Sequence, residues 1–188
     1  GELPQAPAGY VALVDLKDGL ADCATFRKVE MTGLATVSGE DPEPEYVDIN
    51  GNGEVAVTLQ ENNHIAIIDG KTGKVTSHFS AGSVNLQNVD SKSDGAISFT
   101  SEKKDVPREP DTIQWIGNDR LLVANEGDYK GGSRGFTIFN TKGEVLHESG
   151  LDFEHRIAQV GHYPEKRSRA KGVEPEGAEV KAFGDTSY

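Results

Sequence analysis

Glu43-Pro44-Glu45 is a tripeptide that returns twice along the chain, as Glu109-Pro110-Asp111 and as Glu174-Pro175-Glu176, at offsets of 66 and 65 residues. A short run that favours β-structure follows the first copy, Tyr46-Val47-Asp48-Ile49. Self-similarity at a fixed period is the sequence signature of a repeat architecture. The tripeptide therefore marks the start of a repeating structural unit.

The residues after the tripeptide show what each unit contains. Turn residues separate three further β-rich runs after the first copy, at 54–59, 64–69 and 74–79. The second copy repeats this order, with runs at 120–124, 135–140 and 144–148. Short strands joined by Gly, Asn and Asp turns are typical of antiparallel hairpins. We predict an all-β fold, a partial β-propeller with about three four-stranded antiparallel blades of a seven-bladed ring.

The predicted propeller occupies residues 1–188 in six segments. The end of one blade (10–40) is followed by a second blade (41–81) and an inter-blade insertion (82–108). A third blade (109–150), another insertion (151–172) and the start of a fourth blade (173–188) complete the order. Both insertions are polar and charged, and loops of that length are usually functional or disordered. Since the end blades lack strands, we expect a piece of a longer protein, which pairs with its remaining blades or with another copy.

Composition narrows the classes of function. The chain has 31 acidic and 19 basic residues and a formal net charge of −12, which argues against nucleic-acid binding because phosphates would be repelled. An acidic surface suits divalent cations, although a merely solubilising surface explains it as well. No apolar run approaches the roughly 20 residues that span a bilayer, so we predict no transmembrane segment. One cysteine, Cys23, excludes an intrachain disulfide.

Propeller geometry predicts where the tripeptides lie. The first strand of each blade lines the central tunnel, and proline suits the first position of a strand. We therefore expect the tripeptide acids to gather at one mouth of the tunnel: Glu43, Glu45, Glu109, Asp111, Glu174 and Glu176. Such close carboxylates need a cation or other neutralising partners, and Ca²⁺ is a natural occupant. The alternative is that they cap strands and pair with Lys and Arg of the loops.

Polar corners between the second and third strands provide a further set. Glu61-Asn62-Asn63 and Glu126-Gly127-Asp128 are expected at the same end of the propeller as the tripeptides. The predicted metal ligands are Glu45, Asp111, Glu126, Asp128 and Glu176. The predicted ligand-binding residues are Asn62, Asn125 and Arg134. The alternative for these corners is a wide turn held by its own side chains.

Several stretches resemble one family. Residues 43–69, 124–128, 132–136 and 171–177 are similar to the bacterial secreted β-propellers called choice-of-anchor I proteins. These are related to surface-layer propellers and to domains described as phytase-like or labelled alkaline phosphatase. The resemblance implies a propeller fold and a secreted, periplasmic or cell-surface location. A fold passes between relatives more readily than a chemistry does.

Three functions remain open at this point. The first is a non-catalytic secreted or surface-attached propeller that binds a ligand or partner, with a divalent cation, on its acidic rim. The second is a calcium-dependent phosphoesterase, in which carboxylate-bound metal ions activate water and Arg134 contacts a phosphorylated substrate. The third is a scaffold without a small ligand. The sequence shows no nucleophile–base pair and so identifies no catalytic residue, which favours the first function.

Overall fold

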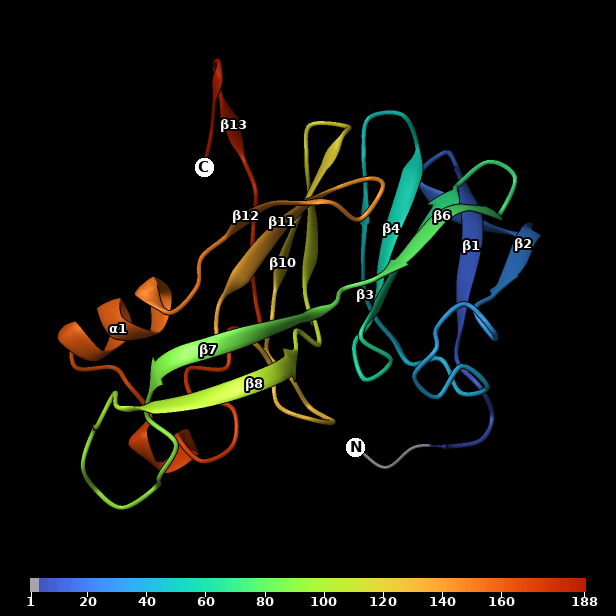
Figure 1. Ribbon diagram of the computed structural model, residues 1–188. Coiled ribbons are helices and arrows are strands. Elements are labelled where there is room, and N and C mark those ends of the chain that lie inside the picture. Colours follow the sequence, from blue (N-terminus) through green and yellow to red (C-terminus); the bar gives the residue numbers. More distant parts are fainter. Residues whose placement is uncertain (1–3) are drawn as a thin grey trace.

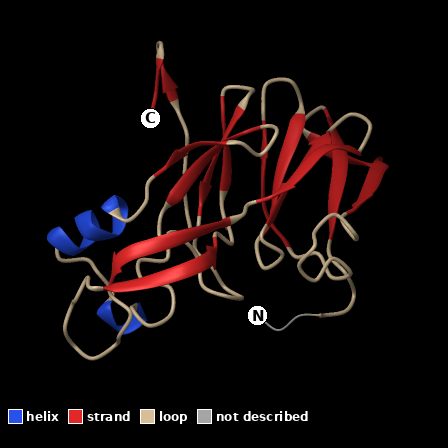
Figure 2. Cartoon of the chain, viewed as in Figure 1, coloured by secondary structure: helices blue, strands red, loops and turns tan. Residues whose placement is uncertain are grey.

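A computed structural model describes residues 4–188 and shows an all-β protein made of small antiparallel sheets (Figures 1 and 2). The first four-stranded sheet contains β3 (Pro44–Ile49), β4 (Glu54–Leu59), β5 (His64–Asp69) and β6 (Lys74–Ser80). The second contains β9 (Ile113–Ile116), β10 (Arg120–Ala124), β11 (Phe136–Asn140) and β12 (Val145–Glu148). The two-stranded sheets are β1 (Tyr10–Lys17) with β2 (Leu20–Glu30), β7 (Ser83–Val89) with β8 (Ser101–Pro107), and β13 (Ala182–Phe183) with β14 (Thr186–Ser187).

The two larger sheets correspond to the two repeats predicted from the sequence. In each, strands that follow one another in the chain are neighbours in the sheet, in the orders β3-β4-β5-β6 and β9-β10-β11-β12. All pairings within them are antiparallel. The structure therefore confirms an all-β fold with four antiparallel strands in each of these repeats.

The core explains the continuous apolar runs at 55–57 in β4 and 65–68 in β5. Successive side chains of a strand point to opposite faces, so a strand covered on both faces reads as a continuous apolar run. One face packs against the second sheet in a cluster of Ala56, Ile65, Ile67, Ala81, Ile113, Trp115, Leu121, Val123 and Phe139. The other face packs against β1 and β2 in a cluster of Val11, Val29, Met31, Val55, Val57, Leu59, Ala66 and Ile68. The two repeats are thus stacked face to face.

Asp48 fixes the first strands of the two stacked sheets against each other. Its carboxylate accepts the backbone N–H of Trp115 at 2.7 Å, and its carbonyl accepts the indole N–H at 3.2 Å. Trp115 is 6% exposed, so both bonds are made where water competes poorly. The start of β9 is therefore held beside β3, which places the second tripeptide close to the first.

The two insertions are ordered segments that pack on each other. Residues 82–108 contain the β7–β8 hairpin, while residues 151–172 contain α1 (Asp152–Gln159) and the 3₁₀ helix η1 (Glu165–Arg167). The backbone N–H of Gly95 bonds to the Glu165 carboxylate at 2.8 Å, and the Ser93 hydroxyl bonds to the Lys166 carbonyl at 2.9 Å. Figure 1 shows the hairpin and α1 on the same side of the second sheet. We call these two segments together the insertion layer.

The C-terminal segment contains little regular structure. Residues 177–180 form no strand, and the short hairpin of β13 and β14 follows them. The third tripeptide is nevertheless anchored, because the Thr112 hydroxyl donates to the Glu176 carbonyl.

Candidate functional site

The structure brings the last acid of each tripeptide to one region. The Thr58 hydroxyl donates to the Asp111 carbonyl at 2.6 Å, and the Thr112 hydroxyl donates to the Glu176 carbonyl. These bonds tie each later tripeptide to residues of the repeat before it. We call the set of five predicted metal ligands the acidic rim: Glu45, Asp111, Glu126, Asp128 and Glu176.

Burial and the neighbouring carboxylates both disfavour the charged form of two rim acids. Burial, followed by the charges of Glu126, Glu45 and Glu176, raises the pKa of Asp111 to about 6. Burial likewise raises the pKa of Glu45, with Glu126, Glu61 and Asp128 adding to the effect. Carboxylates from three repeats are therefore close enough to disfavour one another's charge.

Lys171 supplies a cation within this region. Its ammonium group donates to Glu126 at 3.1 Å and to Asp128 at 3.0 Å, and the Gln60 amide donates to the other oxygen of Glu126 at 2.7 Å. Although burial lowers it, the hydrogen bonds to Asp128 and Glu126 raise the pKa of Lys171 above its ordinary value. Among residues 4–188 no group of three or more His, Cys, Asp or Glu side chains is arranged to hold a metal ion. Glu126 and Asp128 are therefore paired with a lysine of the second insertion.

The first glutamate of each tripeptide has a different environment. Glu109 is 1% exposed, and its carboxylate accepts the backbone N–H groups of Asp128 at 2.8 Å and Lys130 at 2.7 Å. Glu174 instead forms an ion pair with Arg167. Glu109 therefore holds a loop, while Glu174 pairs with a loop arginine and also lies 3.8 Å from the Lys171 ammonium group.

Asn62 and Asn125, both predicted to bind a ligand, make structural hydrogen bonds. The Asn62 amide donates to the Asp41 carbonyl at 3.0 Å and accepts the backbone N–H of Glu43 at 2.8 Å. Asn125 is fully buried, and its amide donates to the Thr137 hydroxyl at 2.8 Å. The structure therefore does not present these donors to the rim, which favours the alternative of a corner held by its own side chains.

Arg134, the predicted phosphate contact, is fully buried in the insertion layer. One guanidinium nitrogen donates to Glu154 at 3.2 Å and to the Asp90 carbonyl at 2.9 Å, and the other donates to the Ser168 carbonyl at 2.6 Å. The structure does not bring Arg134 to the acidic rim. Its charge is compensated by a carboxylate from α1, so this side chain joins the two insertions to the second sheet.

Asp111 allows a test of the rim's electrostatics. A carboxyl whose folded-state pKa is raised makes the fold less stable as pH rises from about 4 to about 6, because the folded state gives up its proton less readily. We expect Asp111→Asn to raise the free energy of unfolding by about 1 kcal/mol at pH 7.5, since solvent screening reduces the full shift. The gain should vanish near pH 4.

Urea unfolding at both pH values measures this difference between variant and wild type. Asp119→Asn, at an exposed turn, is the matched control and should change the free energy little at either pH. A gain for Asp111→Asn that is the same at both pH values would contradict the assignment of strain to the Asp111 charge.

The fold and the rim together define an all-β repeat domain with a carboxylate-rich loop region. Residues 16–131 match the choice-of-anchor I domain, and the chain belongs to that family. No curated protein matches the sequence. Membership in this family indicates a surface or secreted protein. Within residues 4–188, no helix has the length and apolar character needed to cross a membrane.

Proposed function

We propose that this chain forms part of an exported β-propeller whose acidic rim binds a divalent cation, together with the ligand or partner that the cation bridges. The propeller arrangement is supported by the face-to-face stacking of two four-stranded antiparallel sheets, which is how neighbouring blades pack. Exposed apolar side chains on the β1–β2 hairpin, such as Leu16 and Phe26, fit contact with remaining blades or another copy.

One observation carries the proposed binding role, namely the convergence of carboxylates from three repeats around Asp111. Burial and the charges of these neighbouring carboxylates together raise the pKa of Asp111, so the charged form of Asp111 costs stability here. A hard cation with oxygen ligands would relieve that repulsion. Because Lys171 already bonds to Glu126 and Asp128, cation binding at these two residues requires the ammonium group to swing away on its flexible stem.

Isothermal titration with Ca²⁺ tests this proposal. We expect the intact chain to give a binding isotherm, and the Glu45→Gln/Glu176→Gln double variant to lose it. Lys171→Met removes the competing ammonium group and should bind Ca²⁺ more tightly than wild type. Near pH 6, binding should release a proton from Asp111, which appears as a dependence of the measured heat on the ionisation enthalpy of the buffer.

The matched control is Glu102→Gln/Asp119→Asn, which removes the same charge at two exposed positions outside the rim. It should keep the wild-type isotherm. If the Glu45→Gln/Glu176→Gln variant binds as wild type does, or if no heat of binding is seen with the intact chain, the rim is not a cation site.

A further inference from the structure

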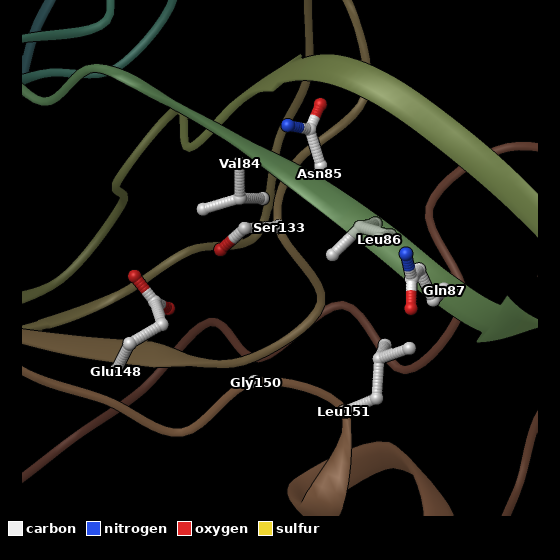
Figure 3. Close-up of a pocket in the computed structure, with 8 residues that line it drawn as sticks. All are labelled: Val84, Asn85, Leu86, Gln87, Ser133, Glu148, Gly150 and Leu151. Atoms are coloured by element: carbon white, nitrogen blue, oxygen red, sulfur yellow. The ribbon is translucent and has the colours of Figure 1, made fainter.

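A pocket of about 400 Å³ lies where the β7–β8 hairpin meets the end of β12. Figure 3 shows the residues that line it: Val84, Asn85, Leu86 and Gln87 from β7, and Ser133, Glu148, Gly150 and Leu151. This volume falls within the range of roughly 300–1,000 Å³ that is usual for small-molecule sites. No residue of the acidic rim lines the pocket, so it is a separate feature of the molecule.

Ser133 is the unusual member of the lining. It is 2% exposed, and within residues 4–188 its hydroxyl finds no hydrogen-bond partner. A buried hydroxyl left without a partner is destabilising, and native proteins keep few of them. Figure 3 shows this hydroxyl directed toward the side of the pocket that holds Glu148. The side chain is thus placed to bond to something inside the pocket.

Glu148 sets the charge that a ligand would meet. Arg108 donates to its carboxylate through two nitrogens, at 2.9 and 2.8 Å, and the Thr137 hydroxyl lies 3.2 Å from both of its oxygens. The carboxylate is therefore fixed in place by Arg108 and Thr137, and a carboxylate has room for about four hydrogen bonds in all. The Glu148 carboxylate would repel an anionic ligand. It would attract a cationic ligand only weakly, because Arg108 already compensates its negative charge.

The remaining lining suits a neutral molecule with both polar and apolar edges. Gln87 provides an amide, which can donate and accept, at the exposed side of the pocket. Val84, Leu86 and Leu151 belong to one apolar cluster and offer an aliphatic wall. Hydroxyl groups can both donate to Glu148 and accept from Ser133, and C–H groups can pack on the wall.

We propose that this pocket binds a neutral polyhydroxylated molecule the size of a single sugar ring. The Ser133 hydroxyl and the Glu148 carboxylate hydrogen-bond to its hydroxyl groups, and Leu86 and Leu151 pack against its carbon frame. The site lies where the β7–β8 insertion meets the second repeat and contains no rim residue, so it does not depend on cation binding.

Saturation-transfer NMR on the intact chain tests the site, with myo-inositol, D-glucose and D-galactose as separate probes. We expect transfer to at least one of them. Ser133→Ala should weaken that binding roughly tenfold while leaving the melting temperature unchanged or higher, since the variant removes an unpartnered buried hydroxyl. Gln87→Trp should block the pocket, and Gln159→Trp, at an exposed position outside it, should bind as wild type does.

Three results would overturn the proposal. They are no transfer to any of the three probes, transfer that persists in Gln87→Trp, and Ser133→Ala binding that equals wild type. A parallel titration with inorganic phosphate followed by its phosphorus signal checks the charge argument. Phosphate binding that Gln87→Trp abolishes would show an anion site and would also refute the neutral ligand.

Discussion

Replacing Arg134 with methionine is expected to lower the free energy of unfolding by about 3–5 kcal/mol, because it leaves a buried carboxylate without its partner. The side chains of Arg134 and Glu154 are 1% and 0% exposed, and their closest nitrogen and oxygen are 3.2 Å apart. The same guanidinium also donates to the carbonyls of Asp90 and Ser168, which are left without it. Chemical denaturation followed by the fluorescence of Trp115 measures the loss.

The pH dependence of this loss identifies its cause. Burial already raises the pKa of Glu154, and Arg134 opposes that rise. Without Arg134 the pKa climbs further, so at acid pH the carboxyl becomes neutral in both states and the cost of Arg134→Met should shrink. An Arg134→Met/Glu154→Leu double variant removes both charges and should recover a large part of the stability at pH 7.

A surface ion pair provides the control. Arg27 bonds to Asp15 at 2.8 Å, but the Asp15 side chain is 58% exposed. Arg27→Met should therefore cost about 1 kcal/mol or less. If Arg134→Met is as mild as Arg27→Met, the buried pair does not hold the insertion layer to the second sheet.

The sequence predicted the repeats because their signals are local. Turn residues and continuous apolar runs, such as residues 65–68, depend on neighbours in the chain and on burial between two layers. The environment of Arg134 has no such signal. Its partners Asp90 and Glu154 belong to different insertions, and only the folded chain brings them together.

The order of the insertion layer was missed for a related reason. Helix α1 has eight residues, which is too short to be stable alone. Charged stretches such as residues 165–169 read as loops, yet the Glu165 side chain and the Lys166 carbonyl bond to the facing insertion. Contacts between distant segments, rather than local propensity, order this layer.

The acidic rim shows which properties of a residue can be predicted from the sequence repeat alone. The period identified Glu45, Asp111 and Glu176 as equivalent positions. In the structure the charges of Glu45 and Glu176 both act on Asp111. The period also made Glu109 and Glu174 equivalent, although one caps a loop and the other pairs with Arg167. A sequence repeat indicates equivalent backbone positions, but the partners of each side chain come from loops that differ between repeats.

Glu109→Ala is the second change with a large expected effect, a loss of about 2–4 kcal/mol in the free energy of unfolding. The substitution leaves the backbone N–H groups of Asp128 and Lys130 without their acceptors. The loop that they belong to is tight, because a Cβ on Gly127 would lie 1.6 Å from the Gly131 carbonyl oxygen. Since this loop carries Glu126 and Asp128, Ca²⁺ affinity should fall although Glu109 is not a rim residue.

The acceptor oxygens of Glu109, rather than its charge, should account for this effect. Burial raises the pKa of Glu109 even though the backbone N–H groups of residues 128–131 oppose the rise, so the folded protein gains nothing net from the ionised form. Glu109→Gln keeps one acceptor oxygen without the charge and should lose less than half as much stability as Glu109→Ala.

The third tripeptide supplies a control with the same backbone. Glu174 has φ of +44° and Glu109 has φ of +45°, so alanine meets similar backbone strain at both positions. Glu174 pairs with Arg167, whose side chain is 49% exposed, and Glu174→Ala should cost about 1 kcal/mol. Equal losses in the two alanine variants would mean that backbone strain, and not the capped loop, decides the stability of this corner. A larger loss at Glu109 alone, accompanied by weaker Ca²⁺ binding, would link the buried glutamate of the repeat to the rim.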